Sequence, residues 1–139
     1  MATEICPNEG KDWIGGNAIA GASLYAFLIR TKTVGAATII AETVQSDLTE
    51  ATGTGYARQS VTMGSITDGI LQIPTFSWST GAATNWPSDI TAWGLTDAPS
   101  GAGTVVYVWD TSTTRNMASA GRTLTVPTCF WFFFNPGEA

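Results

Sequence analysis

The sequence predicts an all-β domain, an antiparallel β-sandwich for which a jelly roll is one possible topology. Composition favours strands over helices, because 22 of the 139 residues are threonine and 15 are glycine, whereas leucine occurs only six times and lysine twice. β-Branched and aromatic residues fit pleated surfaces, and glycine marks turns. Spacing supports the same fold class, because turn residues separate short apolar stretches at intervals of roughly 8–12 residues.

An irregular N-terminal arm is expected over residues 1–21, ahead of a single β-sandwich domain over residues 22–139. Four glycines interrupt the arm. Trp13 and Ile14 would anchor the arm if it docks on a neighbouring surface. The alternative is a loosely docked terminus, which is the more common arrangement.

The first half of the domain is expected to contain two or three strands. Residues 22–31 are rich in β-branched and aromatic residues and predict the first strand, whereas residues 36–45 fit either a strand or a short helix. A loop is expected at residues 47–55 and a strand at residues 56–63. The period of two in that strand assigns its residues to opposite faces, Tyr56, Arg58, Ser60 and Thr62 on one and Ala57, Gln59, Val61 and Met63 on the other.

Two strands are expected in the middle of the domain. Residues 70–78 predict a strand that lies at an edge or is bulged, because Pro74 cannot donate to a ladder. Residues 90–95 predict a short apolar strand. A turn follows at residues 97–101, where Asp, Pro and Gly each favour a turn conformation.

The C-terminal part is expected to close the sandwich. Residues 104–109 are nearly all apolar or aromatic, which is typical of a strand covered on both faces. Residues 110–121 are polar and predict an irregular segment. Residues 122–128 alternate, so that Leu124 and Val126 are expected to point inward.

Composition argues against several functions. Histidine is absent, which removes any imidazole base, nucleophile or ligand, and the two cysteines cannot complete a structural zinc site. The net charge of −5 and six scattered cations argue against nucleic-acid binding. The N-terminus lacks a secretory pattern, and no apolar run approaches the ~20 residues of a membrane helix. We therefore expect folding in a cytoplasm, where Cys6 and Cys129 stay reduced.

No catalytic pattern stands out, and we expect neither an enzyme nor a cofactor or metal. Asp89 and Asp97 flank one predicted strand, while Asp68 and Asp110 lie at turns or strand ends, where carboxylates are usually solvated or cap turns. The glycines do not form a GxGxxG motif, and no GxSxG motif occurs.

The aromatic residues suggest buried surfaces. Trp78, Trp86 and Trp93 fall within sixteen residues and fit a core or subunit interface better than a stacking platform for sugar rings. Five consecutive aromatic residues follow near the C-terminus, namely Phe130, Trp131, Phe132, Phe133 and Phe134. A terminal strand cannot easily hide both of its faces within a domain of this size, so we expect a partner surface there, such as a symmetric homo-oligomer. The alternative is a central strand covered on both faces.

Four segments resemble small structural proteins of tailed bacteriophages over roughly residues 47–128. The first reads DLTEATGTGYARQSV at residues 47–61, and the second reads ITAWGLTDAPSG at residues 90–101. The closing segments read VVYVWD at residues 105–110 and RTLTVP at residues 122–127.

This resemblance implies a virion structural protein without catalytic residues. The expected role is a capsid decoration (cement) protein on the outer surface of the phage head, which binds the major capsid protein at capsomer junctions, with a homotrimer as the expected oligomer. Tyr56 and Arg58 are candidates for polar contacts at this interface, beside Trp13 and the aromatic C-terminal residues. The alternative is a tail-fibre, receptor-binding or carbohydrate-binding module.

Overall fold

The computed structural model describes residues 4–5, 7–10, 14, 19–30, 47–67 and 70–132. These residues form antiparallel β-sheets, so the all-β expectation is confirmed. No helix in these ranges is long and apolar enough to cross a membrane. The predicted element at residues 36–45, Trp13 and Cys6 lie outside the described residues, as do Phe133 and Phe134.

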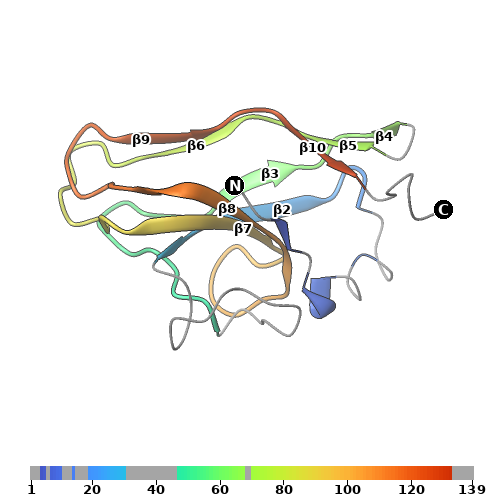
Figure 1. Ribbon diagram of the computed structural model, residues 1–139, viewed down its shortest axis with the longest axis horizontal. Helices are drawn as coiled ribbons and strands as arrows, with labels where there is room; N and C mark the ends of the chain where they lie inside the picture. The colour runs from blue at the N-terminus through green and yellow to red at the C-terminus, as the bar shows by residue number, and fades with distance from the viewer. Residues whose placement is uncertain are drawn as a thin grey trace.

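A five-stranded sheet forms one layer of the molecule (Figure 1). Its order is β1-β8-β7-β2-β3, and each strand is antiparallel to its neighbours. This strand order does not establish a jelly roll. The strands are β1 (Glu4–Ile5), β2 (Ser23–Arg30), β3 (Gln59–Thr62), β7 (Ile90–Thr96) and β8 (Val105–Arg115).

A long two-stranded ribbon lies across this sheet as a second layer (Figure 1). One side of the ribbon is β5 followed by β6, and the other is β9 followed by β10, with β4 added beside β5. The strands are β4 (Ile66–Thr67), β5 (Ile70–Ile73), β6 (Phe76–Ser79), β9 (Thr123–Val126) and β10 (Cys129–Phe132).

The ribbon keeps one register across a break in both strands. Cys129 pairs with Ile73 on one side of the break, and Val126 pairs with Phe76 on the other. Pro74 lies in the break, where its missing N–H interrupts the ladder, whereas an edge strand or a bulge was expected there. The single strand expected at residues 70–78 is therefore two strands in line.

The core lies between the two layers. Leu24 and Leu28 of β2 face Leu71 and Trp78 of the ribbon, and each of these four side chains is at most 1% exposed. Alternate residues of β2 point to the other face of the sheet. There Phe27 joins a smaller buried cluster with Ile29, Leu48, Ala92, Val105 and Val108. β2 is thus buried on both faces, which explains its nearly continuous apolar sequence.

β8 extends further than its sequence predicted. It continues to Arg115, so the expectation of an irregular segment from residue 110 is wrong for residues 110–115. The pairing with β7 shifts there, with Asp110 opposite Ala92 and Arg115 opposite Ile90. This shift places extra residues on β8 as a bulge, which lets a polar, threonine-rich segment remain in the sheet.

Parts of the N-terminal arm lie against β8. β1 pairs with β8 at Val108 and Trp109, and the Glu9 carboxylate accepts a hydrogen bond from the Val105 amide at 2.7 Å. Ile19 is buried in the core, and Ile14 packs against it.

Candidate functional site

Only part of the predicted interface falls within the described side chains. Phe130, Trp131 and Phe132 lie in β10, which pairs with β5, but the structure describes their backbone alone. Tyr56 and Arg58 are described in full. The interface role of this whole set stays a prediction.

Tyr56 occupies a polar site at the end of the loop before β3. Its hydroxyl donates to Glu50 Oε2 at 3.0 Å and accepts from the Leu28 amide at 2.9 Å. The ring packs edge-on against Trp86, with 5.3 Å between ring centroids. Burial of the hydroxyl, with the charge of Glu50 beside it, raises the pKa of Tyr56 well above its ordinary value of 10. Tyr56 therefore stays neutral and holds the loop to β2.

Arg58 links two distant segments. Its guanidinium donates to both Glu50 oxygens, with Nη2–Oε1 at 2.8 Å and Nε–Oε2 at 3.0 Å. It also donates to the carbonyls of Ala98 at 2.8 Å and Gly101 at 2.7 Å. The side chain is 5% exposed, and the hydrogen bond to Glu50 raises the pKa of Arg58. We call Glu50, Tyr56, Arg58 and these two carbonyls the Arg58 clamp.

The alternation expected over residues 56–63 holds only in part. Ser60 and Thr62 are exposed while Val61 and Met63 are buried, as predicted. β3 begins only at Gln59, so Arg58 precedes the strand. Its guanidinium lies 5.6 Å from the centre of the Phe27 ring. Most of the donor capacity of Arg58 is used inside the chain.

Several described carboxylates have structural partners. Asp89 forms an ion pair with Arg30 at 2.9 Å, and Asp97 Oδ1 accepts a hydrogen bond from the Thr104 amide at 2.8 Å. The latter contact closes the loop that the Arg58 clamp holds. Within the described ranges, no three His, Cys, Asp or Glu side chains form a group that could bind a metal.

The described tryptophans are buried. Trp78, Trp86, Trp93 and Trp109 are 1%, 3%, 6% and 8% exposed, so the core interpretation is confirmed for the first three, which the sequence had grouped. Trp93 and Trp109 are cross-strand partners whose rings stack, with 4.2 Å between ring centroids and 10° between ring planes. Trp86 donates to the Thr54 carbonyl at 2.8 Å. An exposed stacking platform is not formed by these rings.

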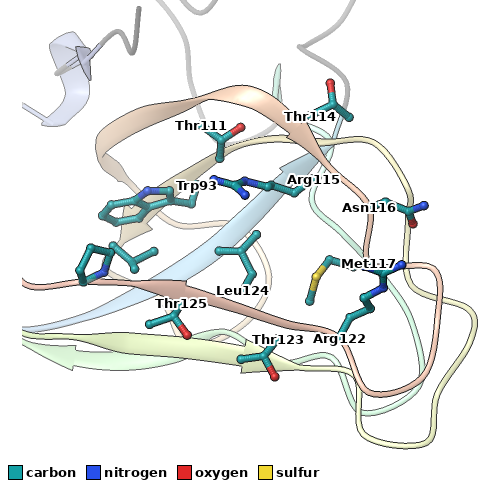
Figure 2. A pocket seen from close by; sticks show the side chains of 12 residues that line it. Trp93, Thr111, Thr114, Arg115, Asn116, Met117, Arg122, Thr123, Leu124 and Thr125 are labelled. Carbon is teal, nitrogen blue, oxygen red and sulfur yellow. The ribbon is translucent and has the colours of Figure 1, made fainter.

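A cleft of about 460 Å³ opens between the end of β8 and β9 (Figure 2). We call it the β9-side cleft. Its lining includes the apolar side chains of Trp93, Met117, Leu124 and Val126, and its remaining lining residues are mostly polar. These remaining residues are Thr111, Thr114, Arg115, Asn116, Arg122, Thr123, Thr125 and Pro127.

Two arginines give the β9-side cleft its charge. In Figure 2 the Arg115 side chain extends over the cleft toward Trp93, and Arg122 lies beside Met117. Both arginines are exposed, and neither has a carboxylate partner among the described side chains. Sequence analysis missed this site because its two arginines converge only when the β8–β9 connection folds back. The one available sign was the density of threonine at residues 111–114 and 123–125.

Comparison with known proteins identifies no relative of this chain. No protein-family model matches the sequence, and neither a curated protein nor a solved structure is significantly similar to it.

Proposed function

We propose that this chain is a virion structural protein of a tailed bacteriophage, which decorates the outside of the head at capsomer junctions. The single observation that carries the proposal is the Arg58 clamp. Two of the segments that resemble phage structural proteins, residues 47–61 and 90–101, are joined by it through Arg58. Because Arg58 links the two segments into one unit, there is a physical reason why they occur together in one chain. This supports the resemblance.

The character of the described surface supports a structural role. Glu50, Asp89 and Asp97 are held by an arginine or a turn amide instead of facing one another across a cleft. The net charge of −5 would keep decorated particles apart in solution.

The aromatic C-terminal residues are the proposed contact with other copies. β10 carries the sequence Cys-Phe-Trp-Phe and pairs only with β5 among the described strands. The other edge of β10 has no partner among the described strands, and unpaired strand edges favour association. Burial of these aromatic residues would hold the proposed trimer together and stabilise capsomer junctions.

The proposal is tested by counting copies in purified virions of the phage that encodes the chain. Quantitative mass spectrometry against the major capsid protein would give hundreds of copies in near-integer ratio for a decoration protein. A handful of copies would overturn the head location and indicate a tail or fibre component. Absence from the virion would overturn the proposal altogether.

The oligomer has its own test. Removal of residues 130–139 is expected to convert the proposed trimer to monomer, measured by sedimentation, with circular dichroism as the check on folding. A folded oligomer after the deletion would contradict the aromatic interface.

A further inference from the structure

We infer that the β9-side cleft binds a carboxylate-bearing saccharide, an activity that a decoration role alone does not require. Its volume of about 460 Å³ falls within the ~300–1,000 Å³ of typical small-molecule sites. The bulged end of β8 forms one wall and the edge of β9 forms the other. The site is therefore built by strands and not by loops alone.

The charge of the cleft selects an anion. The chain has only four arginines and a net charge of −5. Arg30 and Arg58 are paired with Asp89 and Glu50, whereas Arg115 and Arg122 both line the cleft without a carboxylate partner among the described side chains. The planar fork of guanidinium donors matches a carboxylate in bidentate geometry. An acidic ligand would supply the partner that each guanidinium lacks.

The rest of the lining favours a ligand rich in hydroxyl groups. The hydroxyl of Thr114 has no hydrogen-bond partner among the described residues, whereas Thr123 and Thr125 lie on the opposite side of β9 from Leu124 and border the cleft at its rim. Asn116 uses Oδ1 to accept from the Ala118 amide, which leaves its Nδ2 donor for a ligand. Leu124 is half-buried and is the apolar side chain against which the C–H face of a sugar ring can pack, since Met117 and Trp93 expose only 3% and 6% of their surface.

An acidic peptide is the competing ligand, and the edge of β9 disfavours it. Six consecutive residues, 122–127, line the cleft, so the cleft runs along the strand edge. A peptide would bind such an edge by strand addition, which requires an uninterrupted row of backbone donors. Pro127 has no N–H and ends that row at the cleft itself.

The test is a titration of the full chain with trigalacturonic acid, followed by calorimetry and by tryptophan fluorescence. Replacing both arginines (Arg115→Gln with Arg122→Gln) is expected to weaken binding at least about tenfold, since each charge-assisted hydrogen bond contributes more than the 1.4 kcal/mol of one decade. Arg30→Gln is the matched control, because it removes the same charge outside the cleft, and it is expected to leave the affinity within about twofold.

Three further results decide the ligand class. The methyl ester of trigalacturonic acid, which keeps the hydroxyls and loses the charge, is expected to bind at least about tenfold more weakly. No binding of trigalacturonic acid at millimolar concentration, or equal weakening by Arg30→Gln, would overturn the inference. Tighter binding of hexaglutamate than of trigalacturonic acid would replace the saccharide with an acidic polypeptide.

Discussion

The Arg58 clamp and the β9-side cleft use the same residue type in opposite ways. In the clamp, one guanidinium is 5% exposed and donates to a carboxylate and two loop carbonyls. In the cleft, two exposed guanidinium groups have no carboxylate partner among the described side chains. An arginine with a nearby acid becomes a cross-link of the fold, whereas an arginine without one keeps its donors for a ligand.

This contrast predicts which substitutions change stability and which change ligand binding. Changes in the clamp are expected to lower the free energy of unfolding, while exposed substitutions in the cleft are expected to change stability by less than about 0.5 kcal/mol.

The largest effect is expected for Arg58→Met. This change leaves Glu50 without its cationic partner, although Tyr56 still donates to it, and leaves the carbonyls of Ala98 and Gly101 without these hydrogen bonds. It is expected to cost about 3 kcal/mol by denaturant unfolding. Arg30→Met is the control, because the Arg30–Asp89 pair is partly exposed, at 42% and 31% of its side chains, and should contribute under about 1 kcal/mol. Equal losses in the two variants would show that Arg58 is not a cross-link.

Gly94→Ala is expected to have the next largest effect. A Cβ at this position would lie 2.8 Å from Cζ of Phe27, the ring beneath Arg58, and 3.2 Å from the Tyr107 carbonyl oxygen. Overpacking of this kind costs about 1–3 kcal/mol. On the cleft side, Gly121 has open space around it and a φ of +74°, so Gly121→Ala should cost only about 1 kcal/mol from backbone strain. A smaller loss for Gly94→Ala than for Gly121→Ala would contradict this packing.

The clamp also predicts a decline of stability at alkaline pH. The pKa of Tyr56 is raised in the folded state, so its contribution is complete below pH 10 and is lost as pH rises above 10, when the unfolded chain releases the proton first. The slope should reach about 1.4 kcal/mol per pH unit. In Tyr56→Phe the slope of unfolding free energy against pH should be smaller by that amount. An unchanged slope would show that Tyr56 does not cause the decline in stability at alkaline pH.

The smallest effect, a gain, is expected for Thr96→Val. Thr96 is fully buried at the end of β7, and its hydroxyl has no partner among the described residues. Removing it should raise the free energy of unfolding by about 1 kcal/mol and Tm by about 3 °C. Thr80 is the matched buried residue near the cleft, where its hydroxyl donates to the Ser119 carbonyl and accepts from the Arg122 amide. Thr80→Val should therefore lower Tm, and a gain there would contradict the assignment.

The sequence was most informative where local pattern and packing agree. The strands at β2, β7 and β9 follow from β-branched residues and alternation, and Val126 is buried as predicted. The extension of β8 could not be predicted, because a polar segment containing Asp110 and several threonines lacks an apolar period. Its pairing with β7 is a tertiary contact that overrides that local preference.

The sites were less predictable than the strands because both depend on distant residues. Arg58 meets Glu50 eight positions away but reaches Ala98 and Gly101 across 40 and 43 positions. Alternation alone placed Arg58 on a strand face, whereas the structure places it before the strand. Arg115 and Arg122 share a cleft only through the return of β9 along β8.

The position of β1 has a consequence for the time course of folding. Glu4 and Ile5 pair with Trp109 and Val108, and β2 pairs with β7. β1 therefore waits for a partner that is made roughly a hundred residues later, and β2 waits for β7. At about 5–20 residues per second, roughly a hundred residues of synthesis take about 5–20 seconds. Until β7 is made, the described segments that pair with the apolar strand β2 are β3 and residues 49–51, so the nascent chain depends on rapid completion more than a protein of local hairpins would.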